Sequence, residues 1–330
     1  MQESWQPAYD PATNQQETSE VISMKIGIYG SGNVRRGQPL TALVDEIKDL
    51  EQRGFASYWL PQVGFFDALT MIGLAGPQTS TIEFGTAVVP SYPRHPSALA
   101  QQAATVNSLT GGRLILGVGP SHKPGIEGSL GLSYDSPAKH MREYVTILKS
   151  LGESGQVDFQ GDLFNVRTGF AVAEAQPFPV VISALAPLML QAAGEVADGT
   201  VTWMVGKNTI ASSTAPRIIK AASEAGRPAP RVIAAVPVCV HDDKEQAVAR
   251  SVQIFQHYGA LPNYRRQLDA EGLGEAGEIT VTGNEDEVAA QLQAYADAGV
   301  TEVLASVYPA GDDSRGSFAR TYALLEKLND

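Results

Sequence analysis

The chain has 330 residues, of which 43% are hydrophobic, and its 36 acidic residues outnumber its 24 basic ones to give a formal net charge of −12. This length allows two average domains or one large α/β barrel, and the acidic surplus argues against nucleic acid and anionic membranes, which are bound through clustered Lys and Arg. No apolar stretch approaches the roughly 18 residues of a membrane-spanning helix, and the single cysteine excludes a disulfide framework, so we expect a cytoplasmic protein.

The first segment, residues 1–23, is polar and rich in Gln, Glu, Ser and Thr, with four acids and no base. A signal peptide would need a basic start and an apolar centre, and this segment has neither. Its composition is typical of a disordered tail. We therefore predict a tail over residues 1–23 and one folded domain over residues 24–330.

From Met24 onward, short apolar runs alternate with longer segments of helical periodicity, which is typical of repeated βα units around a parallel sheet. The predicted strands are Lys25–Tyr29, Ser57–Pro61, Ile82–Val89, Leu114–Gly119, Val180–Ala184, Thr200–Val205, Val232–Val240 and Glu302–Tyr308. Helices are predicted between them, for example at Leu40–Gln52, Ser97–Leu109, Ala138–Leu151 and Glu285–Ala298. Gly54, Gly111 and Gly299 follow three of these helices, where a left-handed residue commonly ends a helix. Eight βα pairs fit a single closed (β/α)8 barrel better than an open sheet.

Two segments interrupt the repeat, and we expect both to be insertions over one face of the barrel. Gly155–Ala175 is predicted to contain a hairpin around Gly161, whereas Tyr258–Gly277 mixes loop and helix signals. Pro237 removes a ladder donor from the seventh strand, so we expect that strand to be short or bulged. Cys239 lies in the same apolar run and is expected to be a buried packing residue.

The first strand is followed by Gly30-Ser-Gly-Asn-Val-Arg35, which resembles the start of a dinucleotide-binding loop. Arg35 replaces the third glycine of that pattern, and the second strand ends in Pro61-Gln62 without an acid for a ribose. A flexible barrel loop is therefore favoured over a nicotinamide site. The five histidines lack the spacing of metal ligands, and neither a serine-nucleophile elbow nor a phosphate-binding P-loop occurs.

Glycines and polar residues gather at the end of the fourth predicted strand. Gly117 and Gly119 would let a ligand approach the backbone, and Ser121, His122 and Lys123 bring hydrogen-bond donors and a cation to the rim. Barrel enzymes place their sites at the carboxyl ends of the strands. These residues therefore indicate a ligand site, with an ordinary Gly/Pro loop as the alternative.

Several longer motifs occur in a specific order. They are Phe84-Gly-Thr-Ala-Val-Val89, Arg94-His-Pro96 with Ala100-Gln-Gln-Ala103, Leu109-Thr-Gly-Gly-Arg-Leu-Ile-Leu-Gly-Val-Gly119, Ile182-Ser-Ala-Leu-Ala-Pro187, Ala193-Gly-Glu-Val-Ala-Asp-Gly199 and Thr282-Gly-Asn-Glu-Asp-Glu-Val288. In this order and spacing the chain resembles the bacterial-luciferase-like superfamily and, within it, the oxidoreductases that depend on the deazaflavin coenzyme F420. The resemblance runs from Met24 to near the C-terminus.

This resemblance implies a barrel enzyme that transfers a hydride between C5 of F420 and a small organic substrate. It implies a non-proline cis peptide between Ala87 and Val88 that supports the cofactor ring. The other residues that it assigns to the cofactor are Gln62, Gly119, Ser121, His122, Lys123, the phosphate-binding segment Ser183, Ala184, Leu185 and Ala186, and the cavity residues Thr202 and Trp203. Because members of the family commonly form dimers, a homodimer is one expected assembly.

The chain departs from the sugar-phosphate dehydrogenases of this family in two places. It has Gln62-Val63 instead of an Asp-His pair, and Leu185-Ala186 instead of a glycine pair, so the resemblance does not imply a sugar phosphate as substrate. His122 is the candidate proton donor, and a hydrogen bond to the cofactor or a simple loop position are its alternative roles. FMN is the alternative cofactor. A reduced-FMN-dependent monooxygenase and a non-catalytic cofactor-binding barrel are the competing functions.

Overall fold

The computed structural model describes residues 24–30, 39–64 and 66–329. The predicted tail over 1–23 and most of the Gly30–Arg35 motif, including Arg35 itself, lie outside the described residues. The barrel strands are β1 (Lys25–Tyr29), β2 (Ser57–Leu60), β3 (Glu83–Thr86), β5 (Leu114–Gly119), β8 (Val180–Ile182), β9 (Gly199–Trp203), β10 (Arg231–Val240) and β12 (Glu302–Val307). They follow one another around a parallel sheet, and β10 pairs with both β9 and β12, which closes it. The predicted (β/α)8 barrel is confirmed.

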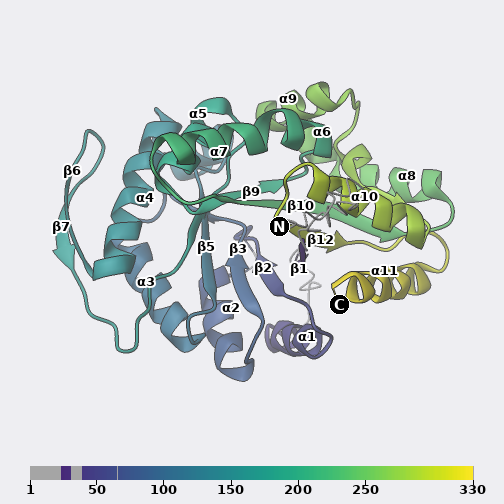
Figure 1. Cartoon of the computed structure of the whole chain (residues 1–330), viewed down its shortest axis with the longest axis horizontal. Coiled ribbons are helices and arrows are strands. Elements are labelled where there is room, and N and C mark those ends of the chain that lie inside the picture. Colours follow the sequence, from purple (N-terminus) through teal and green to yellow (C-terminus); the bar gives the residue numbers. More distant parts are fainter. Residues whose placement is uncertain (1–23, 31–38, 65, 330) are drawn as a thin grey trace, which may run out of the picture.

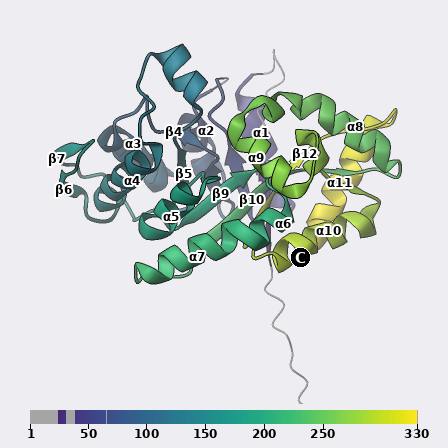
Figure 2. The same ribbon diagram turned by 90° about the horizontal axis from the view of Figure 1, so that it is seen from above.

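Helices surround this sheet, as Figure 1 and the view from above in Figure 2 show. The main ones are α1 (Thr41–Gln52), α2 (Ala68–Ala75), α3 (Pro96–Leu109), α4 (Pro137–Ser154), α5 (Pro187–Val196), α7 (Ala215–Glu224), α8 (Lys244–Phe255), α10 (Glu285–Asp297) and α11 (Ser314–Asn329). Their apolar faces pack on the outside of the strands and form the larger core. Gly54, Gly111 and Gly299 follow α1, α3 and α10 with φ of 79°, 65° and 94°, as the sequence predicts.

Two predicted strands differ from the observed ones. The third divides into β3 and a short β4 (Val89–Pro90), which pairs with β5. The expectation that Pro237 shortens the seventh strand is wrong, since β10 runs unbroken for ten residues. Beside Pro237 only β12 is paired. On the other side β9 ends at Trp203, opposite Ala235, and the short strand β11 (Val281–Gly283), which we did not predict, begins opposite Val238. The carbonyl of Pro237 accepts a hydrogen bond from Thr280 Oγ1 on this unpaired side, so the missing N–H costs the sheet no ladder bond.

The interior of the barrel is filled by side chains. Its apolar layer consists of Trp59, Ile115, Val181, Val201, Ile233, Ala235 and Leu304. Below it, near the amino ends of the strands, the carboxylate of Glu302 accepts hydrogen bonds from Ser57 Oγ and Trp59 Nε1 and lies 2.5 Å from an Arg231 nitrogen. The barrel is therefore a packed core, and space for a ligand remains only above this layer.

We expected both insertions to cover one face of the barrel. The hairpin is present as β6 (Gln156–Gln160) and β7 (Asn165–Gly169), but it stands beside α4 at the side of the barrel (Figure 1). Glu143 of α4 fixes it by accepting hydrogen bonds from three backbone N–H groups of its turn. The second insertion contains α9 (Pro262–Glu271), which packs on the short helix α6 (Lys207–Thr209) at the other side of the mouth. Only this second insertion reaches the cavity described below.

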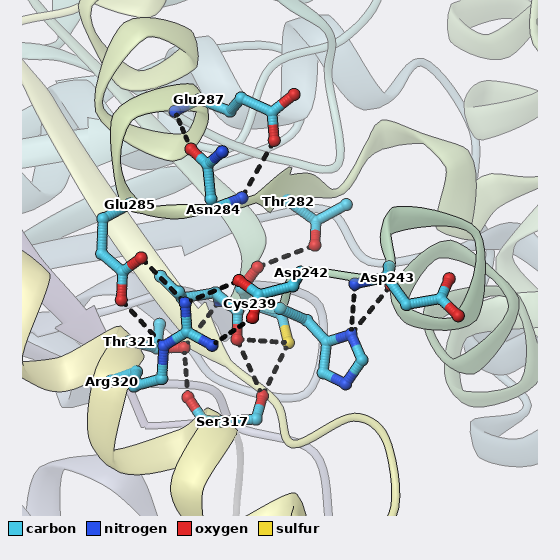
Figure 3. A network of polar contacts seen from close by, with 12 residues as sticks. Cys239, Asp242, Asp243, Thr282, Asn284, Glu285, Glu287, Ser317, Arg320 and Thr321 are labelled. Carbon is cyan, nitrogen blue, oxygen red and sulfur yellow. Dashed lines mark hydrogen bonds and ion pairs between the residues drawn. The ribbon is translucent and has the colours of Figure 1, made fainter.

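Cys239 is buried, as predicted, in a polar network at the end of β10 (Figure 3). Its Sγ lies 3.2 Å from Ser317 Oγ, and burial raises the thiol pKa, which disfavours the reactive thiolate. In the same network Arg320 of α11 forms ion pairs with Asp242 and Glu285, which joins the loops after β10 and β11. No helix among the described residues combines the length and apolar character needed to cross a membrane.

Candidate active site

A backbone bulge after β3 forms one side of the barrel mouth. Thr86 Oγ1 lies 2.9 Å from the N–H of Gly117 and 2.8 Å from its carbonyl, and thereby fastens the end of β3 to β5. The next peptide bond, between Ala87 and Val88, is cis, which confirms the prediction for this bond. The chain then resumes as β4. The bulge thus turns the Ala87–Val88 peptide toward the open end of the barrel.

Two glycines of β5 give this bulge its room. A Cβ on Gly117 would lie 1.8 Å from the Thr86 carbonyl oxygen, and a Cβ on Gly119 would lie 2.8 Å from Val88 Cγ2 and 3.2 Å from Ser183 Cβ. We expected both glycines to make room for a ligand. At Gly117 the nearest neighbour is the protein's own backbone, so this glycine admits the bulge, whereas Gly119 also lines the cavity.

A cavity of about 570 Å³ opens above the bulge, within the usual range for small-molecule sites. Its lining comes from the carboxyl ends of the barrel strands and from the second insertion. The predicted residues that line it are Gln62, Ala87, Val88, Gly119, Ser121, His122, Ser183, Leu185, Ala186, Thr202 and Trp203. Two predicted residues do not: Ala184 is fully buried, and Lys123 points away, with a side chain that is 66% exposed and lies 3.6 Å from Glu127.

Several residues of this cavity were not predicted from the sequence, among them the aromatic residues Tyr29, Tyr258 and Tyr264. Tyr29, at the end of β1, stacks on Trp203 with ring centres 4.8 Å apart, and its hydroxyl donates a hydrogen bond to the Ala87 carbonyl. The second insertion adds Tyr258, Leu261, Asn263, Tyr264 and Arg266, and His257 directly precedes it. The run of aromatic residues from Phe255 to Tyr264 was the available signal, but the pattern did not show which way these rings point.

The loop after β5 presents His122 to the cavity. Ser121 takes a left-handed conformation with φ of 59°, and its carbonyl accepts a hydrogen bond from Tyr134 Oη at 2.9 Å. Burial lowers the pKa of His122 below its ordinary value. At neutral pH the imidazole is therefore mostly neutral, and one of its nitrogens is free to accept a proton.

A second, buried histidine supports this loop from behind. His140 Nε2 lies 2.9 Å from Ser91 Oγ, and its ring stacks on Tyr92, which in turn stacks on Tyr134. Burial lowers the pKa of His140 to about 4, so the ring is neutral and can share one hydrogen bond with the serine. His140 is thus a positioning residue, connected to Ser121 through the two tyrosines.

The segment before α5 offers backbone donors to the same cavity. Helix α5 starts at Pro187, and its cap residue Ala186 makes no side-chain hydrogen bond. Among the described residues, no acceptor is found for the N–H groups of Leu185 and Ala186. Unpaired N–H groups at a helix N-terminus favour an anion. By contrast, no group of three or more His, Cys, Asp or Glu within the described ranges is arranged to hold a metal ion.

Comparison with known families gives one decisive match. Residues 22–302 match the model of the luciferase-like monooxygenases. The chain belongs to this family. The sequence-based expectation of a luciferase-like barrel enzyme is thereby confirmed.

Relatives of this luciferase-like chain cover most of its length. An uncharacterized protein of Mycobacterium tuberculosis is 30% identical over an alignment of 251 positions, which covers 72% of this chain and 74% of the relative. The 5,10-methylenetetrahydromethanopterin reductase of Methanopyrus kandleri is 27% identical over an alignment of 320 positions, which covers 83% of this chain and 90% of the reductase.

Solved structures share the same fold. The coenzyme F420-dependent tetrahydromethanopterin reductase from M. kandleri matches with a TM-score of 0.73 and 23% identity, over 93% of this chain and 98% of its own. An F420-dependent secondary alcohol dehydrogenase, solved with an F420-acetone adduct, reaches 0.75 with 19% identity, over 93% and 100%. A Pseudomonas putida 3,6-diketocamphane monooxygenase constituent with FMN reaches 0.70 with 16% identity, over 93% and 97%. At these identities the structures establish the luciferase-like fold.

Proposed function

We propose that this protein is an F420-dependent oxidoreductase that transfers a hydride between C5 of the deazaflavin and a small organic substrate. The observation that carries this proposal is the cavity of about 570 Å³ at the carboxyl ends of the barrel strands, above the backbone bulge between β3 and β4. Family relatives whose names specify F420 support the choice of cofactor. When bound, the deazaflavin gives or accepts the hydride, and the protein supplies binding, orientation and a proton-transfer group.

The residues of the cavity fit a planar ring with an anionic tail. Ala87 and Val88 would support one face of the ring, because both belong to the partly buried apolar group above the barrel interior. Gln62, Gly119, Ser121 and Thr202 line the same cavity and would contact the cofactor, and Trp203 also lines it. The unpaired N–H groups of Leu185 and Ala186, between Ser183 and α5, would receive a phosphate. Ala184 and Lys123 would contribute less directly, since neither side chain lines the cavity.

An assay of hydride transfer tests this function. Under anaerobic conditions we expect the protein to oxidise reduced F420 in the presence of at least one member of a panel of enones, imines, quinones and ketones. The alternative, a luciferase-like monooxygenase, would instead need reduced FMN and oxygen to convert a substrate. Turnover only under those second conditions would contradict the proposal, and a failure to turn over under either would favour the non-catalytic cofactor-binding barrel.

His122 is proposed as the proton-transfer group, because it lines the cavity with a largely neutral imidazole. In the direction of substrate oxidation, the neutral ring would take the hydroxyl proton while the hydride leaves the carbon. Because burial lowers its pKa, this form is lost only in acid, so the oxidative rate should rise with pH to a plateau whose midpoint lies below about 6.5. In the reductive direction, which needs the protonated ring, the rate should instead fall through the same midpoint.

The pH profile of kcat in a His122→Gln variant checks this role. We expect a loss of roughly 100-fold in kcat together with loss of the midpoint. His95→Gln is the control, because His95 is exposed, caps α3 and does not line the cavity. A His122→Gln variant that keeps the midpoint would assign the titration to another group.

A further inference from the structure

The two sides of the cavity differ in character. The arc of the barrel formed by β3, β4, β5 and β8 presents small groups, among them Ala87, Gly119 and Ser183. The opposite side presents four aromatic rings, those of Tyr29, Trp203, Tyr258 and Tyr264, which we call the aromatic wall. Tyr29 and Trp203 come from β1 and β9, which are not paired with each other, so their stack spans the mouth across β10 and β12.

The rings of the aromatic wall form a continuous series. The ring centres of Trp203 and Tyr258 lie 5.9 Å apart, and those of Tyr258 and Tyr264 lie 5.0 Å apart, both in edge-to-face arrangements. Gln267 Nε2 on α9 donates a hydrogen bond to the Leu185 carbonyl, which ties the insertion to the opposite side of the cavity. The wall is therefore held in place by packing on one side and by this bond on the other.

The aromatic wall is also electrically neutral. Burial raises the phenol pKa of Tyr29, Tyr258 and Tyr264, so these hydroxyls keep their protons at neutral pH. The buried Nε1 of Trp203 has no hydrogen-bond partner among the described residues. Among the described residues that line the cavity there is no Asp, Glu or Lys, and Arg266 is the one Arg.

We propose that the aromatic wall is the substrate subsite and that it takes an uncharged, planar conjugated ketone. Flat rings bind each other by offset stacking and edge-to-face contacts, and the wall offers both. A sugar phosphate would need several charged donors, and the four rings of the wall offer only neutral hydroxyl and indole groups. Among the described residues that line the cavity, no carboxylate is present to pair with a cationic substrate. This inference rests on the proposed function, because it assumes that F420 binds on the opposite side of the cavity, beside Ala87, Gly119 and Ser183.

Binding to the protein without turnover tests the proposal. Isothermal titration of the full chain, with and without oxidised F420, would use 2-acetylnaphthalene as the planar probe. Its comparison ligands are 2-acetyldecalin, which has the same skeleton without planarity, the anion 2-naphthoate, and glucose 6-phosphate. We expect 2-acetylnaphthalene to bind at least about tenfold more tightly than each of the others. Tighter binding of the saturated ketone or of either anion would overturn the proposal.

Variants separate the wall from the cofactor side. Tyr258→Leu should weaken 2-acetylnaphthalene about three- to tenfold by removing one ring contact, while F420 affinity stays unchanged. Phe318→Leu is the matched control, because Phe318 on α11 is also a half-buried ring that packs against another ring, Tyr322, but does not line the cavity. If Tyr258→Leu does not fold, Leu261→Asp, which adds a charge to the cavity from the same insertion, should have an even larger effect.

The outcomes distinguish this inference from the proposed function. Binding of F420 without binding of 2-acetylnaphthalene would overturn the substrate subsite alone. Unchanged ketone affinity in the folded Tyr258→Leu and Leu261→Asp variants would do the same. Binding of the ketone to the aromatic wall without binding of F420 would keep the subsite and contradict the cofactor.

Discussion

Replacing Val88 with Asp should weaken F420 binding by at least about 100-fold. Each factor of ten in affinity corresponds to roughly 1.4 kcal/mol of binding free energy. Val88 lies at the cis peptide, lines the cavity and belongs to the apolar group above the barrel interior. An ionised carboxylate there would lose its hydration when a ring covered it. Titration of the purified variant with oxidised F420 measures the loss.

The control for this prediction is Val88→Thr, which keeps the shape of the side chain without its charge. Its affinity for F420 should be within about threefold of that of the unaltered protein, since removing a hydroxyl from water costs far less free energy than removing a charge. Circular dichroism would establish that both variants are folded. A folded Val88→Asp variant with unchanged affinity would mean that the ring lies elsewhere in the cavity.

The largest effect on stability is expected for Glu302→Ala, at about 3–5 kcal/mol of the free energy of unfolding. Glu302 is 1% exposed and accepts hydrogen bonds from Ser57 and Trp59 while it pairs with Arg231. Its removal leaves the Ser57 hydroxyl without its buried acceptor. The Trp59 indole N–H and the Arg231 guanidinium lose their buried carboxylate and keep only Ser57 Oγ at 2.9 Å and the partly exposed Glu83 at 3.5 Å. Chemical denaturation followed by circular dichroism measures the change.

Glu83→Ala provides the matched comparison, because Glu83 lies at the same end of the barrel. It pairs with Lys25 at 3.2 Å and with Arg231 at 3.5 Å, but its side chain is 32% exposed. Exposed pairs of this kind contribute about 1 kcal/mol or less. Equal losses in the two variants would show that the buried carboxylate of Glu302 does not anchor the floor of the barrel.

The barrel could be predicted from the sequence because its strands are short apolar runs that recur between helical segments. β1 and β5 have the predicted bounds, and β10 differs by one residue. β11 was missed because its three residues show no periodicity. The effect of Pro237 was predicted wrongly for a different reason. Whether a strand can hold a proline depends on where the neighbouring strands end, here β9 and β11, and the sequence of β10 does not show this.

The candidate site could likewise be predicted only in part from the sequence. The cis peptide and the residues after β5 and β8 could be placed because they belong to motifs in continuous sequence. Tyr29 and Tyr258 could not, because one ends a strand and the other lies in an insertion with mixed signals, and only the fold brings both to Trp203. Lys123 shows the converse, since a cation beside the site in sequence pairs with Glu127 outside it.

The most direct test of the account is a titration of the cofactor-free protein with oxidised F420 and, separately, with FMN. The proposed function predicts saturable F420 binding at least about tenfold tighter than FMN binding. Tight binding of FMN with no detectable binding of F420 would contradict the proposed function and favour the monooxygenase alternative.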